Sequence, residues 1–207
     1  MQEVGYQNVL IVVSAMGKMT NAFEWLINSY CYNKKKEKEC LNDIVDFHNK
    51  ILWDLFPDKS HKVYVEVNEL LFQMEELLQK DYSNYYDETY DSFVGYGELI
   101  STTIVSQYLK SQNIDNKWVD VRRVIKTNSN FRQAKVDWEQ TQSNINSLDL
   151  NSIIVSQGFI GCDNSGETTT LGREGSDFSA AIFGYCCNAK SVTIWKDVAG
   201  VLHADPK

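Results

Sequence analysis

The sequence predicts an α/β fold, a three-layer αβα sandwich with a mostly parallel central sheet and a helical insertion. Residues 8–13 (NVLIVV) form an uninterrupted apolar run rich in β-branched side chains, which is typical of a strand buried on both faces. Further strand-like runs follow at 118–121, 153–160 and 192–195, and helical patterns separate them. Strands that alternate with helices favour a parallel sheet covered on both faces.

Length and composition set limits on the class of protein. The chain has 207 residues, of which 43% are hydrophobic and 23% charged, so it can bury one sizeable core. The net charge is −8 and no basic stripe is present, which argues against a nucleic-acid partner. No apolar run approaches the roughly 20 residues that span a bilayer. Without a signal-peptide pattern, and with five irregularly spaced cysteines, we expect a cytoplasmic protein with no disulfide framework.

The first strand leads into a loop of small residues at 14–20, and a helical pattern follows at 21–30. Ligands of α/β proteins commonly bind at the carboxyl end of such a strand, where the loop meets the helix. Thr20 therefore has two interpretations. Its hydroxyl is either a simple helix cap or a contact to a ligand.

The next part of the chain is helical. The charged run at 34–39 (KKKEKE) opens a helix with an apolar stripe, and its alternating charges favour a solvated surface over a binding patch. Pro57 ends that helix, and a third apolar stripe occupies 62–79. We therefore predict a helical excursion at 21–82 within a single domain at 1–207.

A long helical pattern at 91–111 follows, and Glu98 stands after two glycines in what we expect to be its beginning. A carboxylate near a helix start is favoured by the helix dipole, so Glu98 is either a surface cap or a clamp for a ligand ammonium.

The segment at 168–177 (TTTLGREGSD) is the most informative part of the sequence. Its threonines favour an extended conformation, and Ser176 and Asp177 occupy the N-cap position of an apolar helix at 178–187. A helix N-terminus attracts anions, and the fork of Arg173 suits a carboxylate or a phosphate. The segment therefore predicts a site for a small acidic ligand, in which Asp177 is either a cap or a carboxylate that positions lysines around a phosphate.

The last predicted strand, at 192–195, is followed by Lys196 and Asp197, where nucleotide contacts gather in open α/β sheets. Neither a Rossmann nor a Walker A glycine loop is present, and we assign no metal site because the histidines lack metal-ligand spacing. From the residues alone, the chain is a ligand-binding α/β domain for an anionic or zwitterionic small molecule.

Five segments of the chain are considered together: VVSAMGKMTN at 12–21, GYGELIS at 95–101, VDVRRVIKTNSNF at 119–131, SQGFIGCDNSGETTTLGREGSD at 156–177 and IWKDVAGVLHADPK at 194–207. Taken in this order, they resemble the aspartate kinase catalytic domain of the amino-acid kinase family. The fourth segment is long and specific to aspartate kinases, whereas related kinases for acetylglutamate, glutamate or uridylate share only the outline of the fold.

The resemblance implies transfer of the γ-phosphoryl group of ATP to the β-carboxylate of L-aspartate. The product is 4-phospho-L-aspartate, and this step opens the biosynthesis of lysine, threonine and methionine. ATP is implied as the co-substrate, with Mg²⁺ arriving on its phosphates. The resemblance also implies a homo-oligomer for the full-length enzyme. From the charge and the lack of a long apolar run, we expect neither a nucleic-acid nor a membrane partner.

Site residues carry over from the resemblance position by position. Arg173 matches a contact to a substrate carboxylate, Glu98 a contact to the ammonium, and Asp177 the acidic residue that organises the phosphate-binding lysines. The remaining matches to aspartate contacts are Thr20, Glu174, Gly175 and Ser176. The matches to nucleotide contacts are Lys196, Asp197, Leu202, Asp205 and Lys207.

Members of the family begin with a strand and a Lys-Phe-Gly-Gly-Thr-Ser loop, and continue beyond the Asp-Pro-Lys turn to a second phosphate lysine and to ACT domains. The chain resembles a fragment without these parts, so we expect little or no kinase activity from the 207 residues alone. Two alternatives stay open: a non-catalytic subunit that binds aspartate for regulation, and an amino-acid kinase for another acidic substrate.

Overall fold

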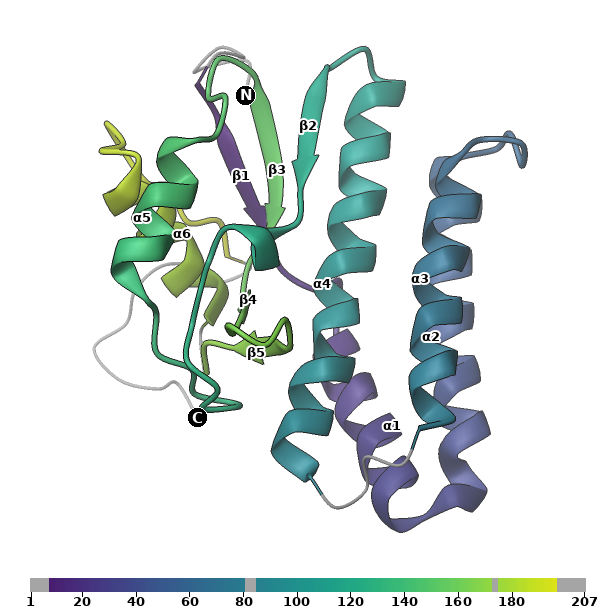
Figure 1. The fold of residues 1–207 in the computed structure, drawn as a ribbon. Helices are drawn as coiled ribbons and strands as arrows, with labels where there is room; N and C mark the ends of the chain where they lie inside the picture. Colours follow the sequence, from purple (N-terminus) through teal and green to yellow (C-terminus); the bar gives the residue numbers. More distant parts are fainter. Residues whose placement is uncertain (1–7, 81–84, 173–174, 197–207) are drawn as a thin grey trace.

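The structure is a computed structural model, and it describes residues 8–80, 85–172 and 175–196. Figure 1 shows the elements in chain order. They are β1 (Leu10–Val13), α1 (Met19–Tyr32), α2 (Lys34–Leu55), α3 (Val63–Leu78), α4 (Tyr86–Ser111), β2 (Asn116–Val119), the 3-10 helix η1 (Val121–Arg123), α5 (Trp138–Asn146), β3 (Ile153–Gln157), β4 (Ile160–Cys162), β5 (Thr168–Thr170) and α6 (Gly175–Cys186).

A parallel sheet lies at the centre, in the strand order β1-β3-β2. Leu10 pairs with Ile154 and Val119 with Ser156, so the carboxyl ends of all three strands lie at one edge. Every residue of β3 is buried, as expected for the central strand of a covered parallel sheet. The parallel sheet predicted from the apolar runs is confirmed.

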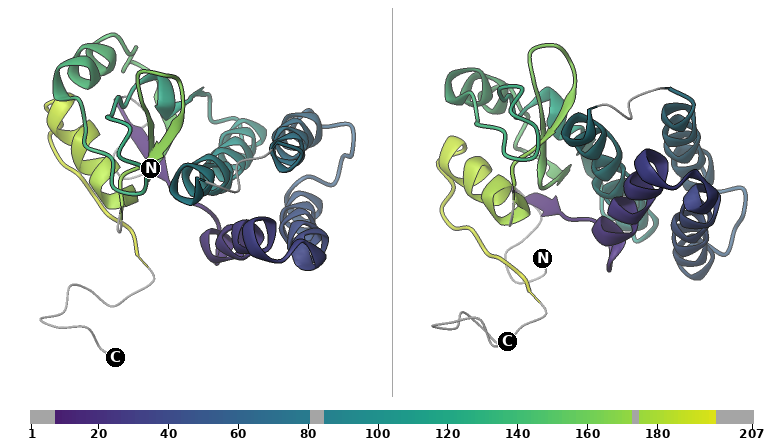
Figure 2. Two further views of the ribbon diagram at one scale, coloured as in Figure 1. Left: turned by 60° about the horizontal axis from the view of Figure 1, so that its bottom comes forward. Right: turned by 90° about the horizontal axis from the view of Figure 1, so that it is seen from below.

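Helices cover both faces of this sheet. Helices α5 and α6 lie on one face and α4 on the other, and α1, α2 and α3 lie beyond α4 (Figures 1 and 2). The predicted α/β class with layers of helices around a parallel sheet is therefore confirmed. Within the described part of the chain, no helix combines the length and the apolarity that crossing a bilayer requires.

Helix α4 lies at the centre of the packing, which explains why most of its residues are buried. Its apolar side chains pack against the sheet on one side and against α1 and α3 on the other. Most of the largest fully buried side chains of this core come from these helices and from α2. They include Phe23, Leu26, Ile27, Ile44, Leu52, Met74, Phe93, Leu99, Ile100 and Ile104.

Several predicted boundaries are wrong. The helix expected at 91–111 begins earlier, at Tyr86, and the helix expected at 21–30 runs from Met19 to Tyr32. The apolar run at 153–160 is two strands, because Phe159 adopts a left-handed backbone conformation with φ +70° and turns the chain from β3 into β4. Strand β4 then pairs antiparallel with β5.

The strand predicted at 192–195 is also wrong, since these residues form no regular element. Val192 instead lies against Gly184 of α6. A Cβ atom added at Gly184 would be only 2.4 Å from the Cγ2 atom of Val192. Ile194 and Trp195 are 50% and 90% exposed. Val192 thus contacts a helix while staying 49% exposed, which a strand-like pattern alone does not reveal.

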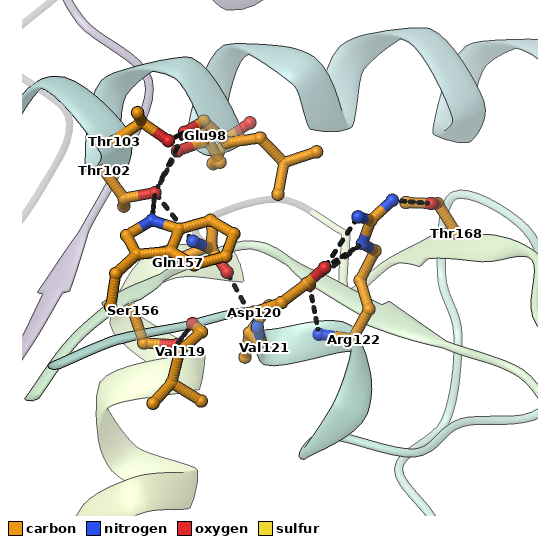
Figure 3. Close-up of polar contacts among 12 residues, drawn as sticks. Glu98, Thr102, Thr103, Val119, Asp120, Val121, Arg122, Ser156, Gln157 and Thr168 are labelled. Atoms are coloured by element: carbon orange, nitrogen blue, oxygen red, sulfur yellow. Dashed lines mark hydrogen bonds and ion pairs between the residues drawn. The ribbon is translucent and has the colours of Figure 1, made fainter. Parts of the chain in front are cut away.

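Polar side chains fasten the ends of β2 and β3 to α4, as Figure 3 shows. The Gln157 side chain donates to Thr102 Oγ1 at 2.7 Å and accepts from the Val121 amide at 2.7 Å. The Trp118 indole donates to the same hydroxyl at 2.9 Å, and Thr102 donates to the Glu98 carbonyl at 2.8 Å. Buried polar groups of this kind fix register because each one needs its partner. The turn of α4 that carries Glu98 is thereby held to the sheet edge.

Candidate active site

A cavity of about 1070 Å³ lies at the carboxyl ends of β1 and β3, the position where ligands bind in open α/β sheets. Its wall comes from the loop after β1, the first turn of α1, α4, the loop around residues 130–133, the β3–β4 turn and the first turn of α6. Among the predicted site residues that the structure describes, the lining includes Thr20, Glu98, Gly175, Ser176, Asp177 and Lys196.

Glu98 is the most unusual group in the cavity wall. It lies more than three turns into α4, so the prediction that it stands at a helix start, favoured by the dipole, is wrong. Its side chain is only 2% exposed, Oε1 accepts one hydrogen bond from the Ala15 amide at 3.2 Å, and Oε2 has no partner among the described residues. Burial raises the pKa of this carboxyl to about 8. A buried carboxyl without a counter-charge would be ionised by a ligand cation that binds beside it.

The loop after β1 reaches Glu98 because Gly97 leaves room for it. A Cβ atom at position 97 would lie 3.0 Å from the Ala15 Cβ and 3.3 Å from the Phe23 ring. Ser101 completes the contact by donating to the Ser14 carbonyl at 2.7 Å. The glycine thus allows the backbone of the loop to lie directly on α4.

Thr20 is the second residue of α1, half-buried, and it lines the cavity. The N-cap position is Lys18, and no side chain caps this helix. The capping interpretation of Thr20 is therefore wrong, and its hydroxyl lies on the wall of the same cavity as Glu98.

The start of α6 differs from the prediction in one respect. The helix begins at Gly175, so Ser176 and Asp177 lie in its first turn and not at the N-cap of a helix at 178–187. The β3–β4 turn presses against this turn: a Cβ atom at Gly175 would lie 2.6 Å from the Phe159 ring, and one at Gly158 would lie 2.7 Å from Ser176. The two glycines thereby bring the N-terminus of α6 to the cavity.

Asp177 and Lys196, predicted respectively as catalytic and nucleotide-binding, form an ion pair of 2.7 Å. Both side chains line the cavity and are partly exposed, at 33% and 42%. Six of the predicted site residues lie outside the described part of the chain: Arg173, Glu174, Asp197, Leu202, Asp205 and Lys207.

Two functional candidates were missed by the sequence analysis, Asp91 and Arg132. Asp91 is fully buried in α4 and accepts hydrogen bonds from the Arg132 amide at 2.9 Å, the Thr170 amide at 2.8 Å and the Thr170 hydroxyl at 2.8 Å. Burial outweighs these donors and raises its pKa to about 6. This carboxyl joins α4, the 130–133 loop and β5. Its only sequence signal was an acidic residue in an apolar helical pattern.

The described residues contain no group of three or more His, Cys, Asp or Glu side chains that could hold a metal ion. The ionisable groups of the cavity instead form separate pairs and single charges. Such a wall suits an organic ligand that carries its own charges.

Known proteins resemble this chain over most of its length. The aspartokinase of Chlamydia trachomatis is 34% identical over 200 residues, which cover 95% of this chain and 44% of that protein. The lysine-sensitive aspartokinase 3 of Escherichia coli is 38% identical over 122 residues, 56% of this chain and 27% of that protein. The chain thus spans less than half the length of the curated relatives it matches.

Solved structures of an aspartokinase also resemble this chain. The crystal structure of E. coli aspartokinase III in complex with aspartate and ADP superimposes with a TM-score of 0.84 at 31% identity, covering 93% of this chain and 43% of that chain. The lysine- and aspartate-bound form superimposes with a TM-score of 0.83. The model of the amino acid kinase family matches residues 2–207. On this match, the chain belongs to the amino acid kinase family.

Proposed function

We propose that this chain forms the aspartate-binding and phosphoryl-transfer site of an aspartate kinase, which converts L-aspartate and ATP into 4-phospho-L-aspartate and ADP. The observation that carries the proposal is the buried Glu98, whose Oε2 atom has no partner among the described residues and which shares a cavity with the first turn of α6. Relatives named as aspartokinases, one crystallised with aspartate and ADP, support this choice of substrates.

The amino acid would bind through opposite charges at its two ends. Its ammonium group would donate to Glu98, and the hydroxyls of Thr20 and Ser176 would accept or donate beside it. Arg173 and Glu174, which lie outside the described residues, and the Gly175 amide complete the proposed contacts. Since an ammonium ion offers three donors, the unpaired Glu98 oxygen gains a partner without losing the Ala15 amide.

In phosphoryl transfer, an oxygen of the β-carboxylate forms a bond to the γ-phosphorus while the bond from that phosphorus to the bridging oxygen breaks and ADP leaves. The protein's part in such a reaction is positioning and charge neutralisation. Lys196 would lie beside the phosphates, held in place by Asp177, and the N-terminus of α6 would add its positive dipole end. Mg²⁺ would arrive bound to ATP as part of the substrate. The other proposed nucleotide contacts are Asp197, Leu202, Asp205 and Lys207.

We propose that the chain is part of a longer cytoplasmic protein that forms a homo-oligomer. That protein would catalyse the first step in the biosynthesis of lysine, threonine and methionine. The two phosphate lysines of the family are not among residues 1–207, so we propose that aspartate binding is a property of this chain and that efficient transfer needs the longer protein.

The test is calorimetric titration of the 207-residue chain with L-aspartate, L-glutamate and N-acetyl-L-glutamate. We expect aspartate to bind best. Glu98→Gln should weaken its binding at least about tenfold, because the neutral amide of glutamine cannot form an ion pair with the ligand's ammonium group. Better binding of glutamate or its acetyl derivative would contradict the choice of substrate. A hydroxamate assay for aspartyl phosphate then compares the turnover of the chain with that of the longer protein. Rapid turnover by the chain alone would contradict the proposal that efficient transfer needs the longer protein.

A further inference from the structure

We propose that Asp91 is a positioning residue of the ligand site, which fixes the first turn of α6 relative to Glu98 and thereby the length of the amino acid that fits between them. The inference deepens the proposed function and rests on it, since it assumes that an amino acid binds between these two elements. Asp91 does not line the cavity itself, so it influences a ligand through the residues that it holds.

Three hydrogen-bond donors converge on the carboxylate of Asp91. Its Oδ2 atom accepts from the Arg132 amide at 2.9 Å and from the Thr170 amide at 2.8 Å, and its Oδ1 atom accepts from the Thr170 hydroxyl at 2.8 Å. The side chain is fully buried, so water cannot take the place of a lost partner. A displacement of either donor residue would leave buried polar groups unpaired, and Asp91 therefore fixes both residues against α4.

The first group that Asp91 holds is the loop at 130–133, and all four of its residues line the cavity. Arg132 has a φ angle of +65°, which side-chain-bearing residues rarely adopt. Across the loop, the Asn130 side chain donates to the Gln133 carbonyl at 3.1 Å and the Gln133 amide donates to the Asn130 carbonyl at 3.2 Å. A strained backbone of this kind persists only where surrounding contacts hold it, and the bond to Asp91 is one of them.

The second group is the segment at 170–172, which leads from β5 toward α6. Thr170 is the last residue of β5, and Gly172 turns the chain with a φ angle of +82°. The Gly172 carbonyl accepts from the amide of Gly175, the first residue of α6, at 3.1 Å. Thr170, Gly172 and Gly175 all line the cavity. The start of α6 is thus joined by a short connection to the atoms that Asp91 holds.

The loop at 130–133 and the segment at 170–172 also contact each other. The Ala134 amide donates to the Thr170 carbonyl at 2.9 Å, and a Cβ atom at Gly172 would lie 3.4 Å from the Arg132 carbonyl oxygen. The two segments therefore form one unit, the anchored wall, and Asp91 joins this wall to α4.

Helix α4 carries both Asp91 and Glu98. The two buried residues are seven positions apart, about two turns, so they lie on the same face of the helix. Strand β5 lies beside this helix (Figure 1) and approaches it closely at Gly95, where a Cβ atom would be 3.1 Å from the Thr168 Cγ2 atom. Because an α-helix is rigid over two turns, the separation between Glu98 and the anchored wall is fixed.

A fixed separation selects ligands by length. Aspartate and glutamate carry the same charged groups and differ by one methylene group. A binding site with rigid walls discriminates between ligands that differ by one methylene by about tenfold or more. A wall that is free to shift would lose this discrimination, so Asp91 contributes to the preference for the shorter amino acid.

The experiment compares L-aspartate and L-glutamate on variants of the chain. Asp91→Ala removes the acceptor of all three donors. We expect it to weaken aspartate binding about tenfold by calorimetry and to change glutamate binding less than about twofold by NMR titration. Asp91→Asn should restore both affinities to within about twofold of wild type, because its amide oxygen can accept from both backbone amides and its NH₂ group can donate to the Thr170 hydroxyl.

Asp163 provides a matched control at the other end of the β4–β5 hairpin. It is only 3% exposed, and its carboxylate also accepts three hydrogen bonds, from the Ser129 hydroxyl at 2.7 Å, the Ser165 amide at 2.9 Å and the Glu167 amide at 3.0 Å. None of these four residues lines the cavity. Asp163→Ala should therefore destabilise the chain while leaving both affinities within about twofold of wild type.

Hydrogen exchange measured without ligand tests the anchoring itself. In Asp91→Ala, the amides of Arg132, Thr170 and Gly175 should exchange at least about tenfold faster, whereas Asp163→Ala should leave them unchanged. If Asp91→Ala does not fold, Thr170→Val serves in its place, because it removes one of the three donors from a fully buried side chain. It should reduce the preference for aspartate about threefold.

Four results would overturn the inference, and they differ in what else they affect. If the wild-type chain binds no aspartate, the proposed function fails as well. If Glu98→Gln weakens aspartate binding while Asp91→Ala keeps the full preference for aspartate, only the role of Asp91 is wrong. If Asp91→Ala weakens both ligands equally, or Asp163→Ala reduces the preference as much, the loss reflects stability and not position. Unchanged exchange of the Thr170 amide in Asp91→Ala would show that other contacts hold the wall.

Discussion

At the scale of single residues, Glu98 opposes folding of the unliganded chain. Its folded pKa is raised from 4.5 to about 8, because the charged form is desolvated and the backbone hydrogen bonds of Ala15 and of Glu98 itself compensate only in part. A raised folded pKa means that the contribution of the group to stability is intact below about pH 4.5 and is lost as the pH rises toward 8. The residue that would bind the ligand cation is therefore a source of instability until that cation arrives.

This leads to the first prediction. Glu98→Gln should raise the free energy of unfolding of the unliganded chain at about pH 8 by roughly 2 kcal/mol, and by much less near pH 5. Urea denaturation at the two pH values measures both numbers. An equal effect at both would mean that the amide acts through packing and not through the charge of Glu98.

The second prediction follows from the same carboxyl. At neutral pH it is largely protonated in the free chain, so binding of a ligand ammonium should ionise it and release up to one proton. Calorimetry in buffers of different ionisation enthalpy measures this release. The release should disappear well above pH 8, where Glu98 is already charged. A binding enthalpy independent of the buffer at pH 7 would contradict the proposed contact.

His48 gives the third prediction. It is fully buried in α2, its Nδ1 atom hydrogen-bonds the Ile44 carbonyl at 2.8 Å, and its Nε2 atom has no partner among the described residues. Burial lowers its pKa below 6.5, so its contribution to stability is complete above that value and is lost as the pH falls. His48→Leu should flatten the loss of stability that sets in as the pH falls below 6.5. Thermal unfolding across this range, with the half-buried His61 altered to Gln as the control, provides the measurement.

At the scale of elements, the junction between the β3–β4 turn and α6 has almost no spare volume. Gly175→Ala would place a Cβ atom 2.6 Å from the Phe159 ring, so we expect a loss of about 2 kcal/mol and a displaced helix start. Ala181→Gly, at an exposed position of the same helix, should cost about 1 kcal/mol through helix propensity and leave ligand binding unchanged. Urea denaturation measures the loss of stability of each variant, and titration with aspartate measures its ligand binding. Undiminished binding by Gly175→Ala would show that the helix start does not contact the ligand.

The elements also show how far sequence reasoning reaches. Continuous apolar runs identified both β1 and β3, but only β3 is buried on both faces as such a run predicts. Strand β1 lies at an edge of the described sheet and its residues are half-buried, so the expectation of full burial is wrong for it. The same rule joined β3 and β4 into one strand, because Gly158 was taken as part of the run and the left-handed residue of the turn is Phe159, a type that does not favour such a conformation. A β-branched run also predicted a strand at 192–195, where the partner of Val192 is a glycine on α6. Pairing partners are a tertiary property that local patterns do not encode.

The candidate site was predictable to a similar degree. Thr20, Glu98 and the first turn of α6 were found through their motifs and line one cavity. The physical reason first given for Glu98 was wrong, because its chemistry comes from burial in the middle of α4 and not from a helix end. Arg132 gave no signal, since its position depends on a left-handed turn anchored by Asp91, 41 residues earlier in the chain.

At the scale of the whole molecule, stability is distributed unevenly. Helix α4 packs against the sheet, α1 and α3, whereas α2 lies on the outside with three buried residues, Ile44, His48 and Leu52, in its 22-residue length. We expect amides of β3 and central α4 to exchange hydrogen most slowly, and those of α2 faster by at least about tenfold. Exchange measured by mass spectrometry checks this. Equal protection of α2 and α4 would mean that the molecule opens only as a unit.

Gly97 has a consequence for mutational screens. Its missing side chain lets the loop after β1 supply the Ala15 amide to Glu98, and a side chain there would collide with that loop. In a library selected for loss of aspartate binding, substitutions at position 97 should therefore be recovered alongside those at position 98, even though glycine has no side chain to offer a ligand. A search for ligand contacts based on such a library would mark as a contact a residue whose role is to leave space.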